Sequence, residues 1–205
     1  MSLFSASEEE RISAAIAAAE RKTSGEIVAV VADSSDSYLY VPFMWAALAA
    51  LLIPWPLIHF TWVTVQWIFV VQLLVFLVLL ALLWPKHIRT LLIPKSIRTR
   101  HAHRRATEQF IVQNLHTTEG RTGVLIFVSV AERHAEILAD KGIDEHVAPG
   151  TWQEIVDDLT SHISDGKAAD GFVRAIERSG KYLAQHYPPG RANPNELPDH
   201  LIVLN

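Results

Sequence analysis

The sequence predicts an α/β fold in which one soluble domain is interrupted by a pair of membrane-spanning helices. Two valine-rich stretches, residues 26–32 and 124–130, are typical of buried strands. Between them, residues 37–85 contain no Asp, Glu, Lys or Arg. Because a lone strand leaves its backbone edges unpaired, we expect both soluble halves to share one sheet rather than to form two separate modules.

The uncharged stretch is long enough for two spans. A helix needs about 20 apolar residues to cross a bilayer core, and residues 37–85 number 49. We expect a hairpin over residues 39–85, with spans at about 40–58 and 62–84 and the turn near Pro54 and Pro56. Two buried helices of a soluble protein would need a far larger polar shell than this chain has.

Charges around the hairpin predict its orientation. Seven Lys or Arg and no acid lie between Lys86 and Arg105, whereas the turn between the spans has no Lys or Arg. By the positive-inside rule the N- and C-termini and both soluble halves are expected in the cytoplasm. The absence of cysteine agrees with a reducing compartment.

Periodicity and capping patterns predict the remaining elements. We expect a first helix opened by Ser7, Glu8 and Glu10, a helix from Ile97 to about His116, a strand at 134–139 antiparallel to 124–130, a helix opened by Thr151 and Glu154, a last helix capped by Asp170, and a short C-terminal edge strand. Strand, crossover helix and strand form a parallel βαβ unit. The hairpin would lie inside that crossover, so that residues 1–38 and 86–205 form one discontinuous domain.

Several stretches together resemble the TPM domain family, in its bacterial membrane-protein branch with a transmembrane hairpin inserted in the domain. They are ERKTSGEIVAVV, RTGVLIFVSVAERHAEILADKGID, Trp152, DGFVRAIERSG and NELPD. The resemblance implies a three-layer α/β/α sandwich and a multi-pass protein of the bacterial inner membrane. Family members have been credited with acid phosphatase activity and metal binding, which implies a low-turnover, metal-dependent phosphatase. The family's Gly-Leu-Glu element corresponds here to Gly142-Ile143-Asp144, in which the acid is kept in a shorter form.

Carboxylates follow the two predicted parallel strands. Asp33 and Asp36 come after the first strand and Glu132 after the second, at the sheet edge where ligands bind in parallel α/β folds. Oxygen ligands of this kind suit a divalent cation such as Ca²⁺ or Mg²⁺, and Arg133 could then hold a phosphate. The alternative is a solvated turn beside a hairpin tip.

A second acidic pair is expected at the opposite edge of the sheet. Asp140 and Asp144 follow the antiparallel strand and match the acid of the family element. They could form a separate cation site, and a turn rich in Asp and Gly explains them equally well. The two acidic groups therefore represent two alternative sites and not one.

The expected partners are a lipid bilayer and other membrane proteins. The basic stretch RTRHAHRRA suits anionic headgroups, although it also serves as the topology signal. His101 and His103 are two residues apart on a helix and point away from each other, so they cannot share a metal ion. A net charge of −4 argues against nucleic acid. The small residues Ala46, Ala47, Ala49 and Ala50 allow close helix contact within the hairpin or in a homo-oligomer.

Recognisable enzyme motifs are scarce. The sequence has no glycine-rich phosphate loop, HExxH motif, cysteine pair or nucleophile elbow. The sequence therefore favours a membrane-tethered, partner-binding α/β domain that acts in assembly, maintenance or regulation of membrane proteins. A metal-dependent phosphatase, as the family resemblance allows, is the alternative.

Overall fold

The chain divides into two compact units. The computed structural model describes residues 4–118, 120–189 and 196–204. The first unit joins Met1–Ser35 to Thr99–Asn205 and is called the α/β unit. The second, Asp36–Arg98, is called the hairpin unit.

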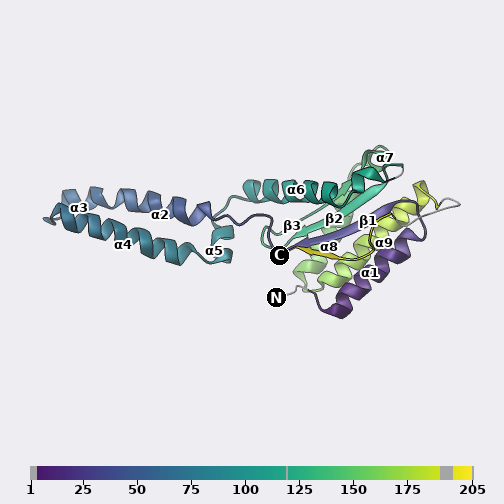
Figure 1. The fold of residues 1–205 in the computed structure, drawn as a ribbon, viewed down its shortest axis with the longest axis horizontal. Helices are drawn as coiled ribbons and strands as arrows, with labels where there is room; N and C mark the ends of the chain where they lie inside the picture. Colours follow the sequence, from purple (N-terminus) through teal and green to yellow (C-terminus); the bar gives the residue numbers. More distant parts are fainter. Residues whose placement is uncertain (1–3, 119, 190–195, 205) are drawn as a thin grey trace. The chain divides into compact units, whose positions relative to one another are not determined.

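A mixed sheet lies at the centre of the α/β unit (Figure 1). Among the described residues it has four strands in the order β3-β2-β1-β4. The strands are β1 Glu26–Ala32, β2 Gly123–Ser129, β3 His134–Ala139 and β4 Ile202–Leu204. β1 is parallel to β2 and to β4, whereas β3 runs antiparallel to β2. The strands predicted from the sequence are confirmed, including the short edge strand at the C-terminus.

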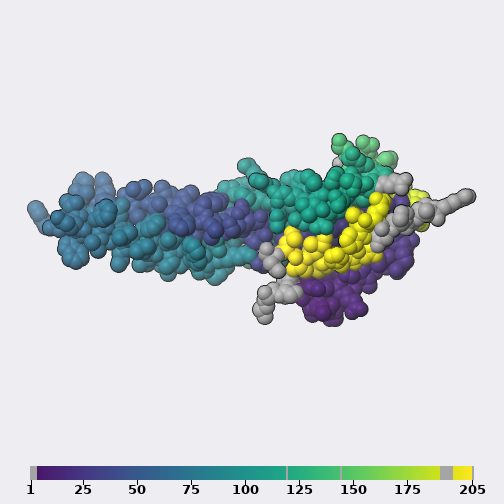
Figure 2. Space-filling view, viewed as in Figure 1, coloured from purple at the N-terminus to yellow at the C-terminus, as the bar shows by residue number. Residues whose placement is uncertain are grey.

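Helices cover both faces of this sheet. One face is covered by α1 Ala6–Glu20, α8 Thr151–Ser164 and α9 Ala168–His186, and the other by α6 Lys95–Val112 (Figure 1). Alternate side chains of β1 divide between the two sides, because successive residues of a strand point to opposite faces. The C-terminal residues lie beside α6 (Figure 2). The α/β unit is therefore a three-layer α/β/α sandwich, as predicted.

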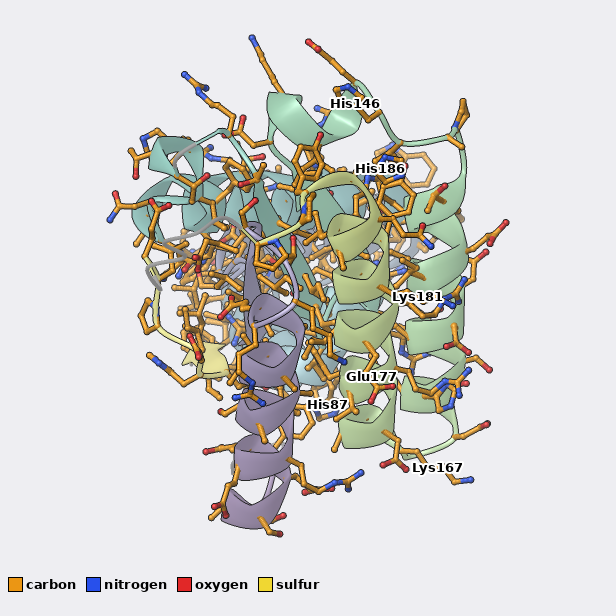
Figure 3. All side chains as sticks on the ribbon, turned by 90° about the vertical axis from the view of Figure 1, so that its right-hand side faces the viewer. His87, His146, Lys167, Glu177, Lys181 and His186 are labelled. Atoms are coloured by element: carbon orange, nitrogen blue, oxygen red, sulfur yellow. The ribbon has the colours of Figure 1, made fainter. Side chains whose placement is uncertain are left out.

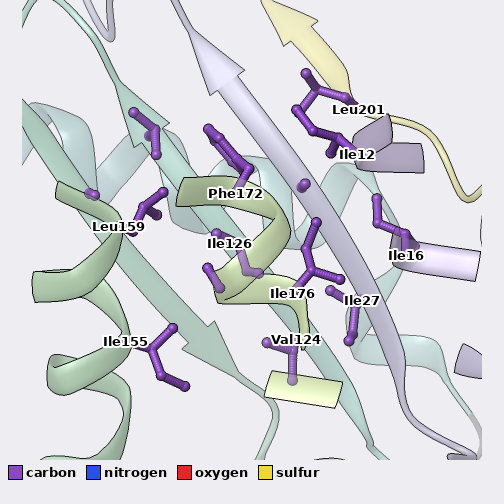
Figure 4. Packing of buried hydrophobic residues seen from close by; sticks show 14 of the residues in the cluster. Ile12, Ile16, Ile27, Val124, Ile126, Ile155, Leu159, Phe172, Ile176 and Leu201 are labelled. Carbon is purple, nitrogen blue, oxygen red and sulfur yellow. The ribbon is translucent and has the colours of Figure 1, made fainter. Parts of the chain in front are cut away.

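The larger core lies beneath α1, α8 and α9 (Figure 4). Phe172 of α9 is fully buried there, and the ring of Phe4 meets it edge-on at 5.7 Å. α1 and α9 approach so closely that a Cβ atom on Gly180 would lie only 2.6 Å from the Cβ of Ala19. The close approach is possible because glycine has no Cβ. The first helix of the chain is thus packed on one of the last, so neither soluble half can bury its apolar face alone.

The first helix begins two residues earlier than predicted. Ser5, not Ser7, is the N-cap, and its side chain accepts a hydrogen bond from the backbone nitrogen of Glu8. The carboxylate of Glu8 accepts in return from the backbone nitrogen of Ser5, at 2.8 Å. Both serines precede a glutamate by three residues, so the sequence pattern alone did not decide between them.

The predicted caps of α8 and α9 are wrong. α8 is capped by Gly150 at φ 92°, and the hydroxyl of Thr151 donates to the Ala148 carbonyl instead of to the helix start. α9 begins after Lys167, which places Asp170 in its first turn. There the carboxylate of Asp170 pairs with Arg11 of α1 at 2.6 Å.

The hairpin unit contains two helical stretches that are long and apolar enough to cross a membrane, Tyr40–Phe60 and Val65–Leu83. The first consists of α2 Tyr40–Leu52 and α3 Pro54–Phe60, and the second is α4. Proline lacks the N–H donor that a continuous helix needs, which accounts for the interruption at Ile53, just before Pro54. The turn predicted near Pro54 and Pro56 is wrong. Both prolines lie in the first turn of α3, where a missing N–H is tolerated, and the turn between the two stretches lies at residues 61–64. These stretches end within three residues of the predicted limits.

Small side chains bring α2 and α4 together. Ala46 and Ala50 lie one turn apart on α2 and are buried in the hairpin unit, whereas Ala47 is exposed. Close packing through small residues is the common mode of helix association in membranes. Of the two uses predicted for the alanines, contact within the hairpin is observed, and a homo-oligomer stays a prediction.

The segment after the hairpin differs from the prediction. A short helix that was not expected, α5 Lys86–Leu91, ends before Pro94, and α6 then begins at Lys95 and not at Ile97. α6 also ends earlier, at Val112, and is followed by a 3₁₀ turn at Leu115–Thr117. Asn114, at φ 58°, separates the two, since asparagine tolerates the left-handed conformation.

The last two residues of α6 are exposed. Ala102 and Ala106 are buried against the sheet, but Ile111 is 55% exposed. Ile111 lies in the last turn of α6, where the helix ends before its inward face is completed. The neighbouring Val112 is 64% exposed, so this end of α6 presents an apolar surface.

Candidate functional site

A buried carboxylate lies at the carboxyl edge of the sheet, where β1 and β2 end. Glu132 is 5% exposed. Both of its oxygens lie 3.1 Å from the backbone nitrogen of Ser35, and one accepts a hydrogen bond from the Ser129 hydroxyl. The hydroxyls of Ser35 and Ser129 are 2.7 Å apart, and that of Ser34 donates to the carboxylate at 3.5 Å. We call Ser34, Ser35, Ser129 and Glu132 the Glu132 cluster.

The Glu132 cluster joins the segment after β1 to the turn after β2. Backbone hydrogen bonds reinforce this junction, since the nitrogens of Val130 and Ala131 donate to Ala32 and Asp33 at 3.0 and 3.2 Å. The chain leaves β1 here on its way to the hairpin unit. The cluster therefore holds the segment after β1 against the turn after β2.

The predicted carboxylates of this edge lie in different surroundings. Asp33 is exposed, and its backbone nitrogen donates to Leu204 of β4 at 2.9 Å. Asp36 is the first residue of the hairpin unit, where its carboxylate accepts from the backbone nitrogen of Tyr38 at 3.3 Å. Glu132 is occupied by N–H and O–H donors that a cation would have to displace. The divalent-cation site at Asp33, Asp36 and Glu132 stays a prediction.

The second predicted pair lies at the opposite edge, where β2 begins and β3 ends. Asp140 directly follows β3, and its backbone nitrogen donates to Gly123 at 2.9 Å. Its Oδ1 caps the short helix α7 Lys141–Asp144 by accepting from the Lys141 nitrogen at 2.7 Å. Asp144 belongs to the same turn, but its side chain lies outside the described residues.

The carboxylate of Asp140 is held close to a loop of backbone. Arg121 approaches Oδ1 at 3.8 Å, while Oδ2 is buried and has no hydrogen-bond partner among the described residues. A Cβ atom on Gly142 would lie 2.5 Å from the carbonyl oxygens of Gly120 and Arg121, so only glycine fits at this contact. The arrangement leaves one buried acceptor oxygen that a cation could satisfy.

Two further buried acids, Glu20 and Glu26, lie at the same edge, near the start of β1. Glu20 Oε1 accepts from the backbone nitrogen of Ile27 at 2.9 Å, and Glu26 Oε1 accepts from that of Glu196 at 3.3 Å. The pKa of Glu20 is raised to about 9, mainly by burial and also by the nearby charges of Glu26 and Asp199, against the hydrogen bond donated by the Ile27 nitrogen. Burial likewise raises the pKa of Glu26. Glu20 is therefore protonated at neutral pH.

Histidines gather around another carboxylate, on the face of the sheet under α6. Glu136 of β3 lies 2.8 Å from Nδ1 of His103 and 3.4 Å from Nε2 of His134. Burial raises the pKa of Glu136, but the hydrogen bonds with His134 and His103 outweigh it and lower that pKa overall. The structure thus places His103 beside Glu136. That His101 and His103 cannot share a metal ion stays a prediction.

No group of three or more His, Cys, Asp or Glu side chains suited to hold a metal ion occurs within residues 4–118, 120–189 and 196–204.

Comparison with known proteins identifies the family that this sequence resembles. Residues 86–182 match the family model of the TPM domain. The resemblance to the TPM domain family is thereby confirmed for this part of the chain, while α1 and β1 lie outside the match. The finer prediction, a membrane branch with an inserted hairpin, stays a prediction.

A solved structure shows the same fold. The NMR structure of the BA42 protein from the psychrophilic bacterium Bizionia argentinensis superposes with a TM-score of 0.62, covering 98% of this chain and 94% of that chain at 22% sequence identity. At this identity the likeness concerns the fold alone. No curated protein matches the sequence.

Sequence reasoning found Glu132 and Asp140 but missed most of their surroundings. The serines of the Glu132 cluster could not be predicted as part of a site, because serine is common in loops. Glu20 could have been found, since Ile12, Ile16 and Glu20 follow one another at four-residue spacing on the buried side of α1. A charged residue in such a position signals a buried acid.

Proposed function

We propose that this protein is anchored in a lipid bilayer by its hairpin unit and uses the α/β unit to bind other membrane proteins, as a factor in their assembly, maintenance or regulation. The observation that carries the proposal is the apolar surface of the hairpin. Along α4 only Ile68 is buried. The exposed side chains of the hairpin include Leu51, Leu52, Phe60, Trp62, Val65 and Phe69, each at least 68% exposed. Water would not solvate such a surface favourably, whereas lipid would.

The short connection after β1 supports a role close to the membrane. Seven residues, 33–39, separate the end of β1 from the start of α2. Fully extended, they span about 25 Å. With the hairpin inserted, the carboxyl edge of the sheet would remain within that distance of the bilayer surface. The partners within reach are then proteins in the membrane or at its surface.

The charge distribution supports cytoplasmic soluble parts in a bacterial inner membrane. Lys and Arg follow the second span and are absent from the turn between the spans. The α/β unit would then face the cytoplasm, and the residues around α3 the outside.

We expect the full chain to remain in membranes that have been washed with alkaline carbonate. A variant in which a Gly-Ser linker replaces residues 39–85 should be found in the soluble fraction. Protease added to inside-out vesicles should digest the α/β unit, and protease added to right-side-out vesicles should not.

Each outcome tests one part of the proposal. Recovery of the full chain in the carbonate wash would contradict insertion. Digestion only in right-side-out vesicles would leave insertion intact and reverse the orientation. Slow hydrogen exchange in β1 and β2 of the linker variant serves as the control that the α/β unit still folds.

A divalent-cation site at Asp140 and Asp144 is our second proposal, and it is the site that a metal-dependent phosphatase would require. The buried Oδ2 of Asp140 favours it. Asp144 follows four residues later, as the last residue of the helix that Asp140 caps. Carboxylate oxygens are the usual protein ligands of Ca²⁺ and Mg²⁺.

Calcium at about ten times its dissociation constant should raise the melting temperature of the detergent-solubilised chain by roughly 4 °C. Asp140→Asn should abolish the rise, whereas the exposed Asp33→Asn should retain it. Loss of the rise in Asp33→Asn instead would assign the cation to the other edge. If Ca²⁺, Mg²⁺ and Mn²⁺ neither raise the melting temperature nor support hydrolysis of p-nitrophenyl phosphate, the phosphatase proposal is wrong.

A further inference from the structure

The segment Lys86–Arg98 carries an inference that deepens, and rests on, the proposed insertion of the hairpin. It contains α5 and the start of α6, and it belongs to the hairpin unit. We propose that this segment, the anchor segment, is an interfacial anchor that binds anionic phospholipid headgroups at the bilayer surface. The bound group would be a phosphate diester carried by a lipid.

Exposed leucines lie beside the end of the second span. α5 starts three residues after the last residue of α4, Leu83. In it Leu91 is 81% exposed, and the next residue, Leu92, is 38% exposed. Exposure of this leucine pair to water is unfavourable, whereas burial among the acyl chains near the headgroups is favourable.

The other side of the anchor segment holds it at the base of the hairpin. Ile93 is 4% exposed and packs with Tyr38 and Val41, at the start of α2. Arg89 donates from Nη1 to the carbonyl oxygen of Ser37 at 2.7 Å. These contacts tie the segment to the point where the first span begins. α5 is therefore fixed beside both span ends rather than free to move away (Figure 1).

The charges of the anchor segment complement an anionic surface. Four Lys or Arg and no Asp or Glu lie between Lys86 and Arg98. Lys86, His87 and Lys95 are exposed, close in sequence to the exposed leucines. Basic side chains next to apolar ones are typical of segments that lie in the interface of anionic membranes. Nucleic acid would match the cations but would leave Leu91 in water.

The absence of cysteine makes a direct test possible. Ser96→Cys, an exposed position within the anchor segment, would carry a fluorescent label. A second chain would carry the label at Leu74→Cys, which is 59% exposed on α4. Each full-length chain would be reconstituted in phosphatidylcholine vesicles that contain a minor share of phosphatidylglycerol. Quenching by spin-labelled forms of the two lipids would then be compared.

We expect spin-labelled phosphatidylglycerol to quench the label at residue 96 several-fold more strongly than spin-labelled phosphatidylcholine. The label at residue 74, in the hydrocarbon core, should be quenched about equally by both. Lys86→Gln with Lys95→Gln should remove most of the preference at residue 96, because each cation removed lowers that preference by up to about fivefold. Salt at about 1 M should weaken it, because it shortens the screening length to about 3 Å.

Lys167→Gln with Lys181→Gln is the matched control, since these exposed lysines lie at the start and on the surface of α9, in the α/β unit (Figure 3). It removes the same charge and should leave the preference unchanged. Equal quenching at residue 96 by both lipids, with normal quenching at residue 74, would overturn the anchor proposal and leave insertion intact. Absence of quenching at residue 74 would overturn insertion itself. A preference that survives Lys86→Gln with Lys95→Gln would show that other residues select the lipid.

Discussion

Replacing Glu132 by alanine should lower the free energy of unfolding of the α/β unit by about 3 kcal/mol. The substitution removes the acceptor of the Ser35 backbone nitrogen and of the Ser129 hydroxyl. Ser129 is fully buried, so its hydroxyl cannot turn to water and keeps the Ser35 hydroxyl, 2.7 Å away, as a partner, while the Ser35 backbone nitrogen loses its carboxylate acceptor. A buried donor left unpaired costs about 1–3 kcal/mol, and hydrogen bonds to a carboxylate are among the stronger ones in proteins.

Hydrogen exchange of the β2 amides in the full chain measures this loss. An unfolding free energy reduced by about 3 kcal/mol corresponds to exchange about 100-fold faster. Glu132→Gln retains one acceptor oxygen and should cost clearly less, while Glu10→Ala, at an exposed position of α1, should change exchange only slightly. Unchanged exchange in Glu132→Ala would mean that the Glu132 cluster does not hold the end of β1.

The centre of the sheet could be predicted from the sequence because its two middle strands, β1 and β2, are short, apolar and fully buried. Residues 26–32 form β1 as predicted, and they carry no polar side chain after Glu26 that would compete with a strand. The parallel pairing with β2 followed from the helix predicted between the two strands, since strand, crossover helix and strand form a parallel βαβ unit. By contrast, α5 was missed because six residues are too few to show a helical period.

The candidate sites were only partly predictable, for a physical reason. Topology brings Glu132 to the carboxyl edge and Asp140 to the opposite one, and the strand order alone implies this much. Which donors surround each carboxylate depends on loop backbone, such as the Ser35 nitrogen, whose position no side-chain pattern encodes. The burial of Glu20 could be predicted from the helical period of α1. Among these acids, Glu20 has the clearest effect on how stability depends on pH.

Glu20 makes the α/β unit less stable as the pH rises. Its pKa is about 9 in the folded chain and 4.5 in a model peptide, so the folded state binds this proton more tightly than the unfolded state. The associated stability is fully present below about pH 4.5 and is lost as the pH rises towards 9. The pKa of Glu26 is raised by burial in the same direction, so both acids favour the fold at lower pH within this window.

Glu20→Gln should therefore stabilise the α/β unit by about 2 kcal/mol at pH 8 and should flatten the fall in stability between pH 5 and 9. Glutamine keeps an acceptor oxygen for the Ile27 nitrogen and carries no proton to lose. Hydrogen exchange of the β1 amides, corrected for the intrinsic pH dependence, measures the difference, which at pH 8 should be about 30-fold slower exchange. Glu10→Gln on the exposed side of α1 is the matched control and should keep the slope of the original chain. If the stability that Glu20→Gln gains over the original chain is no larger at pH 8 than at pH 5, then Glu20 is not a buried acid that is protonated at neutral pH.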